Sequence, residues 1–218
     1  MLYSFTGGAD GAAPYGGVIL DVKGNIYGTT SAGGAFLSGT VYKLSKTGKE
    51  TVLYSFQGYN NGGVDGLSPM GGVTRDADGN FYGTTYFGGT SSCFGQGCGT
   101  VFKLSRTGEE TVLYNFTGEA DGAFPYRKVI QDAKGNLYGT AEYAGDANCG
   151  FRGQGCGTVF KLSHTGNFTV LHSFTGGADG AFPAAEVLFR DAKGNLYRTA
   201  YGGGDISCNC GTVFKLTP

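Results

Sequence analysis

Two glutamates are the residues of this chain that could do hydrolytic chemistry as a pair. Glu142 and Glu186 stand where the third and fourth copies of a repeated pattern depart from the first two copies. Two carboxyl groups that flank a sugar linkage can cleave it, because one protonated carboxyl acts as a general acid while the other acts as a base or nucleophile. The sequence therefore offers Glu142 and Glu186 as candidate catalytic residues of a carbohydrate-active enzyme.

Further polar and aromatic residues fall in or beside the long segments that join the repeated phrases. Aromatic side chains beside carboxylates offer apolar faces and hydrogen-bond acceptors, which together suit a sugar-binding surface. The candidate ligand-binding residues are Asp121, Tyr126, Arg127, Lys128, Tyr143, Asp146, Asp179, Arg198 and Asp205. The alternative is that each aspartate caps its own turn and the phenylalanines nearby pack under the loops.

Both sets of residues belong to a chain with four internal repeats, and a regular repeat outweighs other indications of fold. The phrase Asp-x-x-Gly-Asn begins at Asp21, Asp76, Asp132 and Asp191. A second phrase, "GTVYKL" or "GTVFKL", begins at Gly39, Gly99, Gly157 and Gly211. A third phrase of the type "LYSF" begins at Leu2, Leu53, Leu113 and Leu171. With a looser Asp-Gly-x-x-Pro segment, these phrases define a unit of roughly 51 to 60 residues.

Each unit predicts four short strands joined as an antiparallel meander. Helices are disfavoured by the 43 glycines in 218 residues, because each glycine costs a helix about 1 kcal/mol relative to alanine. Meanders repeated around an axis form a β-propeller, so we expect an all-β, four-bladed propeller in one domain, residues 1–218. The predicted blades span about 10–57, 65–117, 121–175 and 179–218. Residues 1–6 are expected to complete the last blade as its outer strand, which closes the ring and removes an open sheet edge.

The six cysteines fall as three close pairs before the third strand of a repeat, at Cys93 and Cys98, Cys149 and Cys156, and Cys208 and Cys210. This pattern predicts three local disulfides and an oxidising compartment. A metal site is the alternative, but a tetrahedral site needs four converging ligands, so no metal is expected from side chains. The pair separated by one residue, Cys208 and Cys210, is expected to be the most easily reduced.

The charge of the chain limits the classes of partner. A net charge of −1 with 15% charged residues argues against a nucleic-acid partner, which usually requires a basic stripe. No apolar run approaches the roughly 20 residues that span a bilayer. No signal peptide is present, so a secreted protein would have lost it. We expect a monomer whose partner is a polysaccharide or a cell-surface protein.

No cofactor is expected, with one possible addition at the propeller axis. Four inner strands that converge there could present a ring of backbone carbonyls, which suits a structural cation with oxygen ligands. The alternative is that Arg127 or Lys128 reaches inward, pairs with Glu186 and fills the channel. These two arrangements exclude each other.

The segments "GNIYGTTSAGG", "GTVFKLSRTGEETVLYNFTG" and "DGAFP" resemble the Gloeo–Verruco repeat, a bacterial tandem repeat. The resemblance covers nearly all of the chain. It implies a protein that is secreted or held at the cell surface, and it supplies no catalytic residues. The chain differs from larger arrays of this repeat in having four copies and no anchor, so we expect either a complete small propeller or part of a longer protein.

Three functions remain open from the sequence. The first is an extracellular binding module that uses the long-loop face and the channel mouth for a glycan or a protein partner. The second is a glycoside-cleaving enzyme that uses Glu142 and Glu186. The third is a structural repeat without a ligand. The sequence favours the first, because residues that differ between repeats cluster near the expected channel mouth in two adjacent blades.

Overall fold

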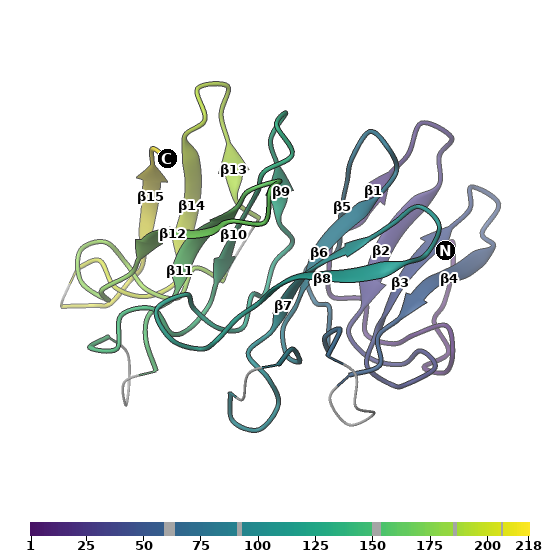
Figure 1. The fold of residues 1–218 in the computed structure, drawn as a ribbon, viewed down its shortest axis with the longest axis horizontal. Helices are drawn as coiled ribbons and strands as arrows, with labels where there is room; N and C mark the ends of the chain where they lie inside the picture. Colours follow the sequence, from purple (N-terminus) through teal and green to yellow (C-terminus); the bar gives the residue numbers. More distant parts are fainter. Residues whose placement is uncertain (59–63, 91–92, 150–153, 185–186, 206) are drawn as a thin grey trace. The chain divides into compact units, whose positions relative to one another are not determined.

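The computed structural model describes residues 1–58, 64–90, 93–149, 154–184, 187–205 and 207–218. These residues form β-strands and turns and contain no helix. The strands are β1 (Ile19–Leu20), β2 (Ile26–Thr30), β3 (Thr40–Leu44), β4 (Glu50–Ser55), β5 (Thr74–Arg75), β6 (Phe81–Thr85), β7 (Thr100–Leu104), β8 (Glu110–Asn115), β9 (Ile130–Gln131), β10 (Leu137–Ala141), β11 (Thr158–Leu162), β12 (Phe168–Ser173), β13 (Phe189–Arg190), β14 (Leu196–Ala200) and β15 (Thr212–Leu216) (Figure 1).

The strands form four separate antiparallel sheets, one for each repeat. Three sheets have the order β1-β2-β3-β4, β5-β6-β7-β8 and β9-β10-β11-β12, and the last is β13-β14-β15. The predicted meander is therefore confirmed with four strands in the first three repeats and with three strands in the fourth. The inner strand of each sheet is only two residues long, shorter than the apolar run "GGVILD" indicated. In the part of the chain that the structure describes, no strand pairs with the outer edge of β15.

The Asp-x-x-Gly-Asn phrase forms the turn between the inner and second strands, as predicted. In the first repeat the Asp21 carboxylate accepts hydrogen bonds from the backbone N–H of Lys23 and Asn25, both at 2.9 Å, and from the Tyr27 hydroxyl at 3.0 Å. Gly24 has a φ of 79°, a left-handed conformation that glycine adopts without strain. The same carboxylate-to-tyrosine bond occurs from Asp76, Asp132 and Asp191. Each phrase is therefore a self-contained structural turn.

Two glycines allow the first two inner segments to approach closely. A Cβ atom on Gly16 would lie 2.3 Å from the backbone nitrogen of Gly72, and a Cβ atom on Gly72 would lie 2.4 Å from the carbonyl oxygen of Gly17. Any side chain at Gly16 or Gly72 would therefore displace backbone. Gly17 itself has open space around its Cβ direction.

Aromatic rings join the first sheet to the second and the third sheet to the fourth. The phenylalanine just after β4 or β12 packs edge-on against an aromatic ring in β7 or β15, respectively. The ring centroids are 5.1 Å apart for Phe56 and Phe102 and 5.1 Å apart for Phe174 and Phe214. Near the N-terminus, Phe5 makes the same contact with Tyr42 at 5.0 Å. Residues 1–6 therefore occupy the place of an outer-strand end beside the first sheet.

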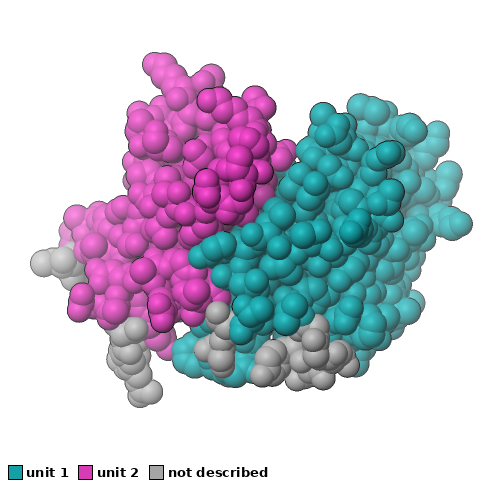
Figure 2. Space-filling model, in the orientation of Figure 1, with its two compact units in different colours: residues 1–115 teal, residues 116–218 magenta. Residues whose placement is uncertain are grey.

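The chain divides into two compact units, residues 1–115 and residues 116–218 (Figure 2). The first unit holds the first two sheets around a core of Tyr27, Val41, Phe56, Val73, Phe81, Phe102 and Leu104. The second unit holds the other two sheets around a core that includes Tyr138, Val159, Phe174, Leu188 and Leu196. Each unit thus has a continuous apolar core of its own.

Candidate functional site

A pocket in the second unit brings together four of the residues that the sequence indicated. Its volume is about 520 Å³. The residues that line it are Tyr126, Arg127, Glu142, Tyr143, Phe182, Ala184 and Tyr201. Tyr126, Arg127, Glu142 and Tyr143 were predicted site residues, and the pocket adds Phe182, Ala184 and Tyr201 to them.

Backbone pairing between loops positions this pocket. Ala123 and Tyr143 exchange two backbone hydrogen bonds at 2.9 and 3.1 Å, and Ala181 and Gly202 exchange two at 2.8 and 3.0 Å. These pairs are the same bridge in the third and fourth repeats, where the Asp-Gly-x-x-Pro segment meets the loop after the second strand. Glu142 precedes Tyr143, and Tyr201 precedes Gly202. The bridge therefore places Glu142 and Tyr201 beside the pocket.

The guanidinium group of Arg127 is held on one wall. Its Nε donates a hydrogen bond to the carbonyl oxygen of Ala184 at 3.1 Å, and its Cζ lies 4.7 Å from the centroid of the Tyr126 ring. Stacking on an aromatic ring fixes the plane of a guanidinium group. The pocket therefore presents a positioned cation on an aromatic surface.

Glu142, next to Tyr143, adds a carboxylate to the pocket that Arg127 also lines. Burial raises the pKa of the Tyr143 hydroxyl, and the charge of Glu142 and a hydrogen bond to its carboxylate raise that pKa further. Tyr143 stays protonated as a donor at neutral pH. Its ring also lies 5.5 Å from the ring of Phe182. The pocket thus combines a hydroxyl donor, a carboxylate and apolar ring surface.

The four predicted aspartates cap turns. Asp121 accepts hydrogen bonds from the backbone N–H of Thr117 at 2.8 Å and from its hydroxyl. Asp146 accepts the backbone N–H of Asn148 at 2.9 Å, and Asp205 accepts the backbone N–H of Ser207 at 2.8 Å. The structure therefore gives these carboxylates the capping role that the sequence left open as the alternative.

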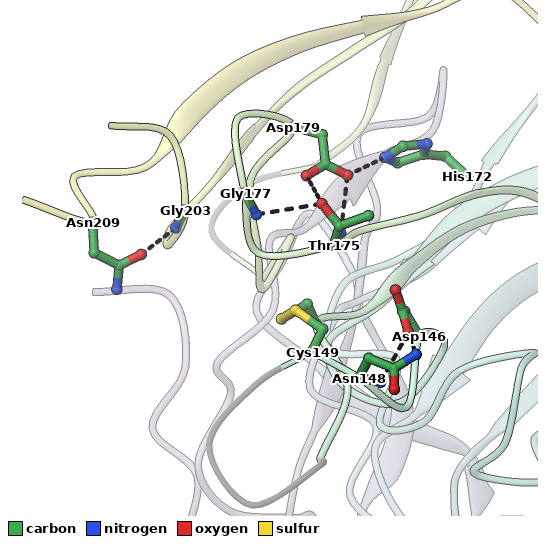
Figure 3. The surroundings of a disulfide bond; sticks show 10 residues. Asp146, Asn148, Cys149, His172, Thr175, Gly177, Asp179, Gly203 and Asn209 are labelled. Carbon is green, nitrogen blue, oxygen red and sulfur yellow. Dashed lines mark hydrogen bonds and ion pairs between the residues drawn. A yellow bond between two sulfur atoms is a disulfide. The ribbon is translucent and has the colours of Figure 1, made fainter. Parts of the chain in front are cut away.

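Asp179 has the same role with a histidine added (Figure 3). It accepts the backbone N–H and the hydroxyl of Thr175 at 2.9 and 2.5 Å, and it lies 3.1 Å from His172 Nε2. Burial raises the pKa of Asp179, but the Thr175 and His172 contacts outweigh it and hold the pKa below its ordinary value. His172 takes the place of the tyrosine in the other repeats, where Tyr3 and Tyr54 bond to Asp10 and Asp65. Asp179 and His172 therefore stabilise the turn that follows the strand β12.

Two predicted basic residues lie outside the pocket lining. Arg198 is 5% exposed, and its Nη1 donates a hydrogen bond to the Thr140 hydroxyl. Lys128 is half-buried, and this burial lowers the pKa of its ammonium group. Glu186, the second candidate catalytic carboxylate, lies outside the described residues. Of the two candidate catalytic carboxylates, only Glu142 is therefore among the described residues.

The described residues contain no group of three or more His, Cys, Asp or Glu side chains that could hold a metal ion. Within the same ranges of the chain, no helical segment has the length and apolar character of a membrane span.

The three predicted disulfides are confirmed, as Cys93–Cys98, Cys149–Cys156 and Cys208–Cys210. Figure 3 shows the second, beside the Asp146 turn. Disulfides of this kind are typical of proteins in oxidising compartments. In the third repeat, a Cβ atom on Gly176 would lie 2.6 Å from Cys149 Sγ, so the disulfide packs directly against the Asp179 loop.

Limited reduction should open the Cys208–Cys210 bond first. Both of its cysteines are exposed, whereas Cys98, Cys149 and Cys156 are 0%, 4% and 2% exposed. Thiol–disulfide exchange requires access of the attacking thiolate to sulfur. Partial reduction followed by alkylation and peptide mass spectrometry should show label at Cys208 and Cys210 before the other four. Earlier labelling of Cys98 or Cys156 would contradict this order.

The four matching sheets and their disulfide-linked loops define an all-β tandem-repeat protein. A sequence model of the Gloeobacter/Verrucomicrobia repeat matches residues 1–152, and the chain belongs to this family. The fourth repeat lies beyond the matched residues but carries the same phrases. A comparison with curated proteins finds no match.

Several solved structures resemble the chain at low identity. They include a candidate gluconolactonase (16% identity, TM-score 0.49, covering 93% of this chain and 63% of that one). A luciferin-regenerating enzyme is 16% identical, with a TM-score of 0.49. That alignment covers 93% of this chain and 60% of the enzyme. A gluconolactonase from Xanthomonas campestris has 12% identity and a TM-score of 0.46, covering 96% and 78%. The chain thus spans about three-fifths of the length of the first two proteins. Its fold is described from its own four sheets.

Proposed function

We propose that this chain is an extracellular binding module that takes a glycan in the pocket between Tyr126 and Tyr201. The observation that carries the proposal is the composition of that pocket. Aromatic rings line it together with a held guanidinium group and a carboxylate beside a tyrosine hydroxyl. Pockets that bind small molecules combine mostly apolar walls with a few positioned polar groups.

A sugar matches these groups better than an apolar ligand does. The ring faces can cover the apolar C–H face of a sugar, while Arg127 donates to its hydroxyl oxygens and Glu142 accepts from its hydroxyl groups. The volume of about 520 Å³ lies within the range of roughly 300–1,000 Å³ for ligand pockets. One or two sugar units are the expected occupant.

The enzyme alternative requires a second carboxylate. Among the described residues that line the pocket, Glu142 is the acidic one, and glycoside cleavage ordinarily uses two carboxyl groups. The second candidate carboxylate, Glu186, lies outside the described residues, so the assay for reducing ends tests cleavage directly.

The proposal extends to the arrangement of the four sheets. They are the blades of one propeller, and residues 1–6 supply the outer strand of the last blade. What supports this is the contact of Phe5 with Tyr42, which repeats the contact of Phe56 with Phe102. Residues 1–6 therefore lie next to the first sheet as a preceding outer strand would. The three disulfides support a secreted or cell-surface location.

Replacing Tyr126 with alanine should weaken glycan binding about tenfold, the size expected for an aromatic residue that anchors a ligand. The matched control is Tyr15→Ala, because Tyr15 follows the same proline in the first repeat and is exposed. Glu142→Gln should weaken binding as well. Retention on polysaccharide arrays and release of reducing ends should be measured together.

Binding without new reducing ends supports the module. Cleavage that Glu142→Gln abolishes would replace the module with the enzyme. No retention by any glycan, with an intact melting transition, would contradict the proposal.

A further inference from the structure

A second pocket, in the first unit, is lined by three cations. It lies between the first two sheets, has a volume of about 290 Å³, and includes Lys43, Arg75 and Arg106. The described residues that line it include no aspartate or glutamate. Like charges that share a pocket repel each other, and the repulsion is relieved when an anion binds among them.

No internal acid neutralises these three cations. Among the described residues, none of these three side chains forms an ion pair with an aspartate or a glutamate. The carboxylate of Asp21, in the turn before Tyr27, accepts hydrogen bonds from that turn and from the Tyr27 hydroxyl. Hydrogen bonds from Asn25 are the main reason that the pKa of Asp21 lies far below its ordinary value. That carboxylate is therefore committed to the turn.

The guanidinium group of Arg75 is held in place before any ligand binds. Its Cζ lies 5.8 Å from the centroid of the Tyr27 ring and 5.7 Å from that of the Phe81 ring. Beneath it, a Cβ atom on Gly79 would lie 2.9 Å from Arg75 Nη2. A stacked guanidinium group has lost conformational freedom already, so less is lost when its edge N–H groups bind an anion.

The turn between β7 and β8 completes the pocket with a second arginine and two hydroxyl groups. The backbone N–H of Arg106 donates to Asn80 Oδ1 at 3.3 Å, which ties this turn to the neighbouring one. Ser105 Oγ and Thr107 Oγ1 lie 2.8 Å apart and also line the pocket. Guanidinium, ammonium and hydroxyl donors together match the oxygens of a tetrahedral oxyanion.

The fourth repeat offers an internal comparison. Arg190 occupies the position of Arg75, and its Cζ lies 5.5 Å from the centroid of the Tyr138 ring. In place of Ser105 and Arg106, however, that repeat has Thr217 and Pro218. Arg190 thus has the same stacking without the second arginine.

We propose that Lys43, Arg75 and Arg106 form a binding site for a sulfate or phosphate group. This site is separate from the glycan pocket, since it belongs to other residues and to the other unit. The group could be free in solution or an ester on an anionic polysaccharide, and the experiment separates these two sources.

Titration calorimetry at low ionic strength should use inorganic sulfate, inorganic phosphate, dextran sulfate and uncharged dextran as probes. Arg106→Gln and Arg75→Gln should each weaken oxyanion binding at least about tenfold, whereas Arg190→Gln should leave it unchanged. Binding should also weaken as salt rises, because ions screen exposed charges. Binding of dextran sulfate without binding of the inorganic ions identifies the ester as the ligand.

Arg106 is exposed in a turn, so its variant keeps the test valid if Arg75→Gln lowers the melting temperature. Tyr126→Ala should not affect oxyanion binding, which keeps this result independent of the glycan pocket. No binding of any charged probe by the unmodified protein would overturn the proposal. An equal loss in Arg190→Gln would also overturn it, because that result means nonspecific attraction to positive charge.

Discussion

Replacing Glu110 with glutamine should raise the melting temperature at pH 9 and leave it nearly unchanged at pH 4. Glu110 begins the strand β8, and its Oε1 atom is buried and has no hydrogen-bond partner among the described residues. Burial, followed by the charge of Asp65, raises the pKa of Glu110 to about 8. An ionised carboxylate at this position is therefore costly to the fold.

The direction of the pH effect follows from the two pKa values. The pKa of an unfolded glutamate is about 4.3, so between about pH 4.3 and pH 8 the folded chain keeps a proton that the unfolded chain loses. Stability falls as pH rises wherever the folded state binds more protons. The penalty is absent below this range and complete above it. Glutamine removes the ionisation, and each kcal/mol recovered raises the melting temperature by about 2–4 °C.

The matched control for this prediction is Glu109→Gln. Glu109 is the exposed neighbour of Glu110, so its replacement changes the net charge equally without relieving burial. Thermal melts of both variants and the unmodified protein at pH 4, 7 and 9 provide the comparison. In the third repeat the same position holds Phe168, whose ring lies 5.7 Å from Phe116 and 5.3 Å from Phe160. An unchanged pH profile in Glu110→Gln would contradict the assignment.

The turns and sheets were predictable because few geometries suit their residues. In the phrase Asp-x-x-Gly-Asn, the aspartate carboxylate can accept hydrogen bonds from the backbone and the side chain of the asparagine four residues later. Asp21 and Asn25 form these bonds. Four copies of that phrase then required four equivalent sheets. The two-residue inner strands were less predictable, since apolar residues around Ile19 indicate burial without revealing how many of them pair with the next strand.

The site was only partly predictable for a related reason. Comparing repeats singled out Arg127 and Glu142, because they break the pattern, and both line the pocket. Tyr201 was passed over because tyrosine also stands at the same position in the second repeat, as Tyr86. The three-cation pocket was missed, although Arg75 and Arg190 differ from Leu20 and Gln131 at the equivalent position. Arginines far apart in a sequence give no sign of sharing a pocket until the turns are placed.

Deleting residues 1–6 should lower the melting temperature by about 3 to 12 °C. Phe5 is half-buried, burial of a phenylalanine side chain contributes about 1.5–3 kcal/mol, and each kcal/mol corresponds to about 2–4 °C in a chain of this length. The deletion removes Phe5 from Tyr42 and the Tyr3 hydroxyl from Asp10, a bond of 2.9 Å. In the proposed closed ring the loss is larger, because deletion would also leave the edge of β15 open to aggregation. A truncated monomer with an unchanged melting temperature would contradict both contributions.

A cross-link separates ring closure from packing on the first sheet. In the first sheet Thr40 pairs with Ser55, and the corresponding residues of a closed last blade are Thr212 and Ser4. Residues directly opposite in an antiparallel pair are close enough for a disulfide. Ser4→Cys with Thr212→Cys should therefore form an intramolecular bond, detected by mass spectrometry of the intact monomer. Ser4→Cys with Lys215→Cys is the control, because Lys215 points to the opposite face of the strand. Cross-linked dimers, or no bond, would mean that residues 1–6 do not complete the last blade of their own chain.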